Sequence, residues 1–141
     1  MTEEQKQLLI KDLCGRLPYG VNILHVKDGI IGVLSNIDIF VEGREQKLKF
    51  VTSFYGDYKV PIEEFKPYLY PLSSMTKEQR TKYGNLNYVV ELTARFNSAH
   101  DHVNELYDWL NKHHFDYRGL IEQGLAIDAT GVAMYSEEEQ P

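Results

Sequence analysis

Two runs of β-branched residues, joined by an Asp–Gly pair, constrain this chain most. The runs cover residues 19–26 and 30–41, and Asp28-Gly29 lies between them. Asp–Gly is a strong signal for the tight turn of a β-hairpin, because the favoured turn needs residues that tolerate a positive φ. The two runs contain little polar surface, so we expect a hairpin that is covered on both faces. The chain is therefore predicted to contain an antiparallel sheet.

Two further segments alternate apolar and polar side chains with the two-residue period of a strand. One spans residues 48–54 and the other spans residues 86–93. Between them, residues 55–75 hold three of the five prolines. This density of proline predicts turns and extended chain, with one short helical turn at residues 62–65. The sheet is therefore expected to have about four strands.

Three pairs of residues have the spacing of a helix capping box. They are Thr2–Gln5, Thr76–Gln79 and Ser98–Asp101. The first pair predicts a helix over residues 3–15, and the second predicts a short helix that ends at Gly84. The third pair begins the clearest helix of the chain, because apolar residues then recur at steps of three and four. That stripe contains Ala99, Val103, Leu106, Tyr107, Leu110 and His114, with Asp101, Glu105, Asp108 and Lys112 on the opposite side.

A second, shorter helix is predicted over residues 117–123. Asp116 is placed to cap its N-terminus, and Gly124 suits the left-handed position that ends it. Leu125 would then contact Leu120, as in a Schellman motif. The fold class predicted is a single α+β domain over residues 1–135. In it, the N-terminal helix and this C-terminal helical pair pack against the small antiparallel sheet. The final residues, 136–141, are expected to be a disordered acidic tail.

Charge and composition limit the classes of function. The chain has 141 residues, with 15 Lys and Arg against 21 Asp and Glu, and a net charge of −6. Because nucleic-acid binders neutralise phosphates with basic residues, we do not expect a nucleic-acid partner. No stretch has the roughly 20 apolar residues that span a bilayer. The N-terminus is too acidic for a secretory signal, and the single Cys14 precludes an internal disulfide. We therefore expect a soluble, cytoplasmic protein.

The sequence lacks the spacings that metal and enzyme sites require. His102 and His113 share one side of the predicted helix but lie roughly 16 Å apart, and no HExxH or Cys–His pattern occurs. The acidic stripe from Asp101 to Asp108 falls on the solvated face. Neither a Gly-rich phosphate loop nor a GxSxG motif is present. Cys14 lies on the apolar side of its helix, which is typical of a small core residue. No metal, cofactor or catalytic residue is predicted.

The segment densest in polar functional groups is His113-His114-Phe115-Asp116-Tyr117-Arg118-Gly119. It lies at the corner between the two C-terminal helices, where side chains can converge. As a site, it would bind an anion or acyl group, with Arg118 as clamp and His113 or His114 as acid or base. As architecture, His114 packs on the apolar stripe, Asp116 caps a helix and Arg118 pairs with a carboxylate. We predict that the architectural role dominates.

A second candidate is the segment Tyr68-Leu69-Tyr70, which lies between Pro67 and Pro71. Two tyrosines in a proline-fixed, extended segment can anchor a protein partner. Alternatively, their rings pack over the sheet with the hydroxyls at the surface, and we favour this packing. The candidate binding residues are therefore Tyr68, Tyr70, His113, His114, Asp116, Tyr117 and Arg118.

Three longer stretches of the sequence are distinctive. They are Asp12-Leu13-Cys14-Gly15-Arg16-Leu17-Pro18-Tyr19-Gly20-Val21, Pro61-Ile62-Glu63-Glu64-Phe65-Lys66-Pro67-Tyr68-Leu69-Tyr70-Pro71-Leu72-Ser73-Ser74-Met75-Thr76, and residues 113–126. Together they resemble a family of short uncharacterised proteins from gut bacterial genomes and their prophages. The resemblance implies an accessory protein of a mobile element, and it assigns no catalytic residue.

Two functions remain open from the sequence. The preferred one is a non-enzymatic binding or interaction module of a phage- or prophage-type accessory protein, with a protein as its partner. The alternative is a small enzyme or a small-ligand (anion) binder that uses the corner from His113 to Arg118. The direction of Arg118 and the two histidines separates them. Convergence into a cleft favours a ligand site, whereas pairing or packing favours the module.

Overall fold

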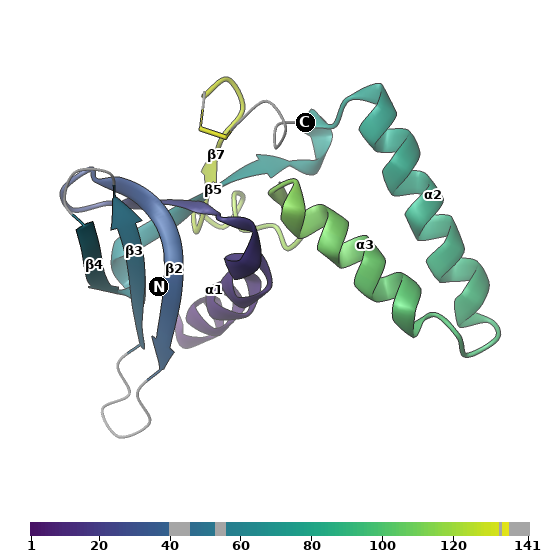
Figure 1. Ribbon diagram of the computed structural model, residues 1–141, viewed down its shortest axis with the longest axis horizontal. Helices are drawn as coiled ribbons and strands as arrows, with labels where there is room; N and C mark the ends of the chain where they lie inside the picture. Colours follow the sequence, from purple (N-terminus) through teal and green to yellow (C-terminus); the bar gives the residue numbers. More distant parts are fainter. Residues whose placement is uncertain (40–45, 53–55, 133, 136–141) are drawn as a thin grey trace.

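The computed structural model describes residues 1–39, 46–52, 56–132 and 134–135. It has an α+β fold around a mixed sheet of seven strands, in the order β4-β3-β2-β1-β5-β6, with β7 also paired to β5 (Figure 1). The strands are β1 (Asn22–His25), β2 (Ile31–Ile39), β3 (Gln46–Thr52), β4 (Gly56–Pro61), β5 (Phe65–Pro71), β6 (Phe115–Asp116) and β7 (Ile127–Asp128). The α-helices are α1 (Glu3–Arg16), α2 (Lys77–Ala94) and α3 (His100–Lys112).

The predicted N-terminal helix and hairpin are both present. Thr2 and Gln5 form the capping box that begins α1, and β1 pairs with β2 in an antiparallel hairpin that continues into β3 and β4. The expectation that both faces of the hairpin are covered is wrong at β2. Leu34 is buried among residues of α1, but Ile31 and Val33 are exposed on the other face. The strand predicted at residues 48–54 is confirmed as far as Thr52, and its last two residues lie outside the described residues. The predicted acidic tail, residues 136–141, also lies outside them.

Residues 55–75 contain more regular structure than the prolines suggested. They include β4, a 3₁₀ turn (η2, Ile62–Glu64) that confirms the predicted helical turn, and β5. β5 is an interior strand, since it pairs antiparallel with β1 and parallel with both β6 and β7. Proline cannot donate to a sheet and so argues against a central strand. Here Pro71 is the last residue of β5, and Pro67 lies opposite Ile23 of β1. The predicted total of about four strands is therefore too low.

Helix α2 replaces both the short helix and the strand that were predicted for this region. Thr76 and Gln79 form the predicted capping box, but the helix continues through Gly84. A glycine inside a helix costs only about 1 kcal/mol, and packing of Leu86 and Val90 in the second apolar cluster compensates for this cost. These two residues are four apart, so they share one face of a helix. The alternation at residues 86–93 was therefore misleading.

Helix α3 confirms the predicted amphipathic pattern but not its cap. Leu106 and Leu110 are buried, whereas Tyr107 is exposed. The N-cap is Ala99, with no side-chain hydrogen bond, so the Ser98–Asp101 capping box is wrong. Helices α2 and α3 form an antiparallel arm that extends away from the sheet, with α2 as its outer element (Figure 1).

Two apolar clusters hold the elements together. The first lies between α1 and the sheet and includes Leu9, Leu13, Ile23, Phe50, Ile62, Phe65 and Leu69. The second joins the arm to β5 and β6 and includes Tyr68, Tyr70, Leu86, Leu106, Leu110, Phe115 and Tyr135. Cys14 belongs to neither and is exposed, which corrects its predicted core position. Of the helices within the described ranges, none is both long and apolar enough to cross a membrane.

Candidate functional site

The segment that follows Asp116 forms turns rather than the predicted helix. Asp116 nevertheless holds the first of these turns, because its carboxylate accepts hydrogen bonds from the backbone N–H groups of Leu120 and Ile121, both at 2.9 Å. The predicted Schellman ending is confirmed. Leu125 N donates to Leu120 O at 2.9 Å, and Gly124 N donates to Ile121 O at 3.0 Å. The terminating motif thus forms even though no α-helix precedes it.

Arg118 pairs with a carboxylate that comes from α1. Asp12 is fully buried and accepts two hydrogen bonds from Arg16, at 2.7 and 3.1 Å. Arg118 Nε lies 3.3 Å from the same carboxylate. Arg16 also donates to the backbone carbonyl of Phe115 at 2.6 Å. Both guanidinium groups lie over the Tyr117 ring, 5.2 and 5.0 Å from its centroid. The corner is therefore fastened to the N-terminal helix.

The sequence alone did not indicate that Asp12 and Arg16 are buried. A signal was present, because Asp and Arg at a spacing of four are neighbours on a helix. Arg16 also extends the stripe of Leu9 and Leu13 toward the core. Charged residues are rarely fully buried unless they are paired. An Asp–Arg pair on an apolar stripe therefore predicts a buried ion pair.

His114 has two properties that are common at functional sites. Its φ is +61°, which is uncommon for a residue other than glycine. Within the described residues, neither of its ring nitrogens has a hydrogen-bond partner. However, its ring is 0% exposed and stacks on Tyr135 with centroids 3.7 Å apart. Burial lowers the pKa of His114 to about 3, and the nearby charge of Arg16 acts in the same direction. A buried, uncharged imidazole offers no positive charge to an anion.

His113 packs with aromatic rings and not with Arg118. Its ring lies 5.1 Å from Trp109 and 6.5 Å from Phe115, measured between centroids. Burial lowers its pKa, and the charge of Lys112 adds to this effect. Each of the three candidate side chains is thus engaged by other groups: the two histidines pack on aromatic rings, and Arg118 pairs with Asp12.

Tyr68 and Tyr70 lie inside the second apolar cluster, so their rings pack against the core. The hydroxyl of Tyr135 donates to the backbone carbonyl of Tyr68 at 2.6 Å, and the Tyr70 ring lies 5.8 Å from the Tyr135 ring. Burial raises the pKa of Tyr68. Both tyrosines are buried, so neither presents its ring to a partner.

A titratable cluster lies apart from this corner, at the end of β1. His25 Nδ1 is 2.9 Å from a carboxylate oxygen of Asp28, and Nε2 is 2.9 Å from one of Glu64. Lys27 also contacts Glu64, at 2.6 Å. Burial opposes the charged form of His25, but the hydrogen bonds to Glu64 and Asp28 outweigh it and raise its pKa. The imidazolium therefore ties the hairpin turn to η2.

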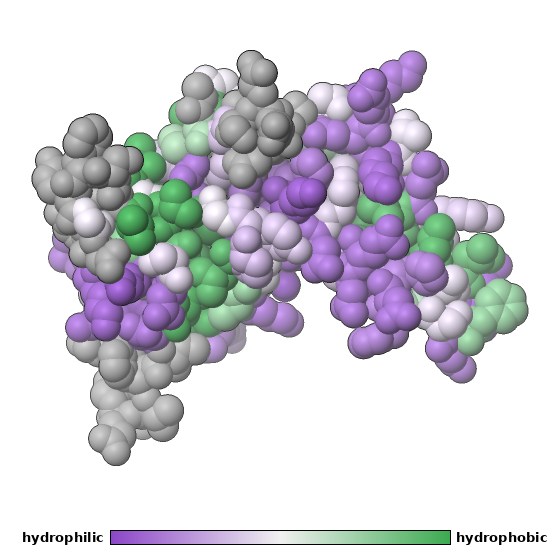
Figure 2. All heavy atoms as spheres, viewed as in Figure 1, coloured by the Kyte–Doolittle hydropathy of each residue, from purple (hydrophilic) through white to green (hydrophobic). Residues whose placement is uncertain are grey.

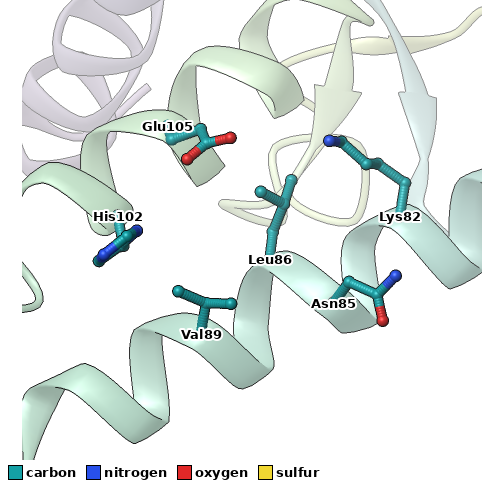
Figure 3. Close-up of a pocket in the computed structure, with 6 residues that line it drawn as sticks. All are labelled: Lys82, Asn85, Leu86, Val89, His102 and Glu105. Atoms are coloured by element: carbon teal, nitrogen blue, oxygen red, sulfur yellow. The ribbon is translucent and has the colours of Figure 1, made fainter.

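A pocket of about 290 Å³ lies between the two helices of the arm. Figure 3 shows Leu86 and Val89 rising from α2 between the helices, with His102 and Glu105 facing them from α3. The complete lining is Lys82, Asn85, Leu86, Val89, His102 and Glu105. The pocket thus has an apolar floor and a rim that carries both signs of charge.

Exposed apolar side chains follow the outer helix beside this pocket. Tyr88 and Leu92 of α2, and Phe96 in the turn that follows α2, are 64%, 41% and 74% exposed, and together they form the exposed stripe. Figure 2 shows apolar atoms gathered at the free end of the arm. Single exposed apolar residues are normal, but a continuous stripe marks a surface that binds another molecule. The alternation at residues 86–93 predicts a strand, so the sequence alone does not reveal this stripe.

Comparisons with protein-family models, curated proteins and solved structures find no match. The resemblance to a gut-bacterial and prophage family therefore stays a prediction. Among the described residues, no group of three or more His, Cys, Asp or Glu side chains could hold a metal ion. The arm, with its stripe and pocket, is the surface that best fits a binding role.

Proposed function

We propose that this protein is a non-enzymatic interaction module whose α2–α3 arm binds a protein partner. The observation that supports the proposal is the exposed stripe of Tyr88, Leu92 and Phe96. Interfaces are enriched in aromatic residues, and a few such residues contribute most of the binding energy. An arm that extends from the sheet can also enter a partner's groove without disturbing the core.

The state of the corner supports this function over an anion-binding site. An anion site needs a free cation, whereas Arg118 is paired with Asp12 and lies over Tyr117. Burial lowers the pKa of His113 and lowers that of His114 to about 3, which disfavours the charged form of both rings. We therefore assign the corner an architectural role. The proposal places the module in the cytoplasm and in an accessory role for a phage or prophage, the context that the sequence resemblance implies.

The test compares two triple variants that remove exposed apolar area from different surfaces. The first is Tyr88→Ser, Leu92→Ser, Phe96→Ser on the arm. The matched control is Ile31→Ser, Val33→Ser, Val51→Ser on the exposed face of the sheet, where all three residues are 42% exposed.

Both variants and the wild type are purified with a tag from the native host, after circular dichroism has established that they fold. We expect a stoichiometric protein partner to copurify with the wild type and with the sheet variant, and to be lost from the arm variant. Equal retention by all three proteins would refute the role of the arm.

A further inference from the structure

We infer that the arm binds an amphipathic α-helix of its protein partner, and that this helix carries Lys or Arg along one flank. The inference rests on the proposed function, because it says what the partner presents to the same surface. It concerns the groove between α2 and α3, which contains the pocket of about 290 Å³. The two walls of this groove differ in chemistry, and together they define the partner.

The wall formed by α2 is largely apolar. Asn85 and Val89 line the pocket, and Leu92 lies three residues beyond Val89, so it continues the same face of the helix toward the free end of the arm. Tyr88 lies beside this row, and both Tyr88 and Leu92 are exposed. From Asn85 to Leu92 the row extends roughly 10 Å, or two helical turns. A docked helix can contact such a row with apolar side chains at spacings of three, four and seven.

The wall formed by α3 is acidic. Glu105 lines the pocket opposite Leu86 (Figure 3), and Asp101 lies four residues earlier on the same face of α3. Both side chains are exposed, and within the described part of the chain neither carboxylate has an ion-pair partner. Lys82 also lines the pocket, but it lies beyond Glu105, toward the sheet end of the groove (Figure 3). A cation on the docked helix can therefore pair with this wall without breaking an existing contact.

The apolar row and the carboxylates lie at the same height along the arm. The ring of Tyr83 stacks on that of Trp109, with centroids 6.5 Å apart, which aligns the two helices. Because the helices are antiparallel, each step forward along α2 corresponds to a step back along α3. Six such steps place Val89 level with Val103, between the two carboxylates of the α3 wall. A single bound helix therefore contacts both walls at once.

A helix fits this groove better than an extended peptide or a small molecule. The backbone groups within α2 and α3 are used in helical hydrogen bonds, so the arm has no strand edge with which a peptide could pair. Two antiparallel helices instead present rows of side chains between which a third helix packs. The pocket is at the lower end of the range of about 300–1,000 Å³ for ligand sites, so it suits side chains of a docked helix. A basic flank also complements the net charge of −6.

The experiment uses two synthetic peptides as probes, each about 18 residues long, the length of α2. Both have the same helical pattern of leucines, and the polar positions are Lys in one and Glu in the other. Binding is followed by NMR of the methyl groups of Val89 and Leu92 at about 0.1 M NaCl, where charges within about 10 Å still interact. We expect the Lys peptide to bind saturably and shift these methyl signals. The Glu peptide should bind about tenfold more weakly or less tightly still.

Two charge reversals separate the groove from a general attraction between opposite charges. Glu105→Lys changes the α3 wall, whereas the matched control Glu122→Lys changes an exposed carboxylate in the turns between β6 and β7. Both alter the net charge equally. Glu105→Lys should weaken the Lys peptide about tenfold and strengthen the Glu peptide, and Glu122→Lys should change either by less than about twofold. Circular dichroism checks each fold, and if Glu105→Lys unfolds, Glu105→Gln and Glu122→Gln replace the pair, with about a threefold effect expected only in the groove.

Three results would overturn the inference. They are the absence of saturable binding by the Lys peptide, methyl shifts that spare Val89 and Leu92, and equal weakening by the changes at Glu105 and Glu122. If one of these occurs while the arm variant still loses its host partner, the proposed function stands and the partner uses another structure. If the Lys peptide binds in the groove but the arm variant keeps its host partner, the proposed function fails, and the assignment of the helix to that partner fails with it.

Discussion

Acid should destabilise this protein through His114, and a single substitution isolates the effect. The imidazole is fully buried against Tyr135, and its pKa in the folded protein is about 3. An unfolded histidine has a pKa of about 6.5. A lowered pKa means that the unfolded state takes up the proton first. The stability is therefore fully present above the unfolded pKa and falls as the pH drops below it.

The size of the effect follows from the pKa difference. Each pH unit below about 6.5 costs up to about 1.4 kcal/mol until the folded state itself binds the proton. Between pH 7 and pH 4, the free energy of unfolding should therefore fall by about 3 kcal/mol through this one group. The pKa values of Asp28, Glu63 and Glu64 are also lowered, so protonation of these carboxylates in acid destabilises the folded protein as well. A variant that lacks only His114 is needed to separate the contributions.

His114→Phe keeps an aromatic ring against Tyr135 and removes the titrating group. The assay is equilibrium urea unfolding at pH 7, 5.5 and 4, followed by fluorescence of Trp109, the single tryptophan of the chain. The wild type should lose about 3 kcal/mol more than the variant over this range. Asn tolerates a positive φ better than Phe does, so His114→Asn serves as a second variant if the first folds poorly. Parallel curves for wild type and variant, or an NMR pKa near 6.5 for His114, would refute this reasoning.

Four further outcomes are expected. Leu110→Ala should lower the free energy of unfolding by about 2–5 kcal/mol, because Leu110 is buried in the second cluster. Glu105→Ala should change it by less than about 0.5 kcal/mol. Urea melts that rank the two variants in the reverse order would contradict the predicted phase of the helix. Asp12→Ala should cost about 3–5 kcal/mol by leaving Arg16 buried without its carboxylate, and an unchanged melt would show that the pair is dispensable. The raised pKa of His25 predicts stability that is complete below the ordinary histidine pKa and lost as the pH rises through the folded value; His25→Gln should abolish this loss in alkaline melts. Thermal melting with and without EDTA should agree within about a degree, since no predicted ligand set has metal geometry, and a large drop would indicate a structural metal.

The sequence by itself determined the local structure whose causes lie within a few residues. The Thr2 and Thr76 capping boxes begin α1 and α2, and the Asp–Gly turn joins β1 to β2. The stripe through Leu106 and Leu110 gave the phase of α3. Even the hydrogen bonds of the Schellman ending followed from Gly124 and its neighbours. Each motif is satisfied by the backbone and side chains of its own segment, so its residues suffice to predict it.

The architectural role of the corner from His113 to Arg118 was predictable from the sequence, but the residues that it contacts were not. Asp116 holds a turn and Arg118 pairs with a carboxylate, as the architectural interpretation required. That the carboxylate belongs to Asp12, more than a hundred residues away in the sequence, depends on how α1 docks. Sequence spacing cannot supply that information, because it describes only neighbours along the chain.

Only the tertiary structure decided where local signals were weak or conflicted. Gly84 and the alternation at residues 86–93 both argued against a long helix, but packing of Leu86 and Val90 on α3 determines the conformation of α2. The two prolines of β5 argued against a strand, but pairing with β1, β6 and β7 makes it an interior strand of the sheet. Such contacts each outweigh a local preference of about 1 kcal/mol. For the same reason, only the fold shows which side of α2 is exposed. The packing of one face of the helix determines which apolar residues remain on the other.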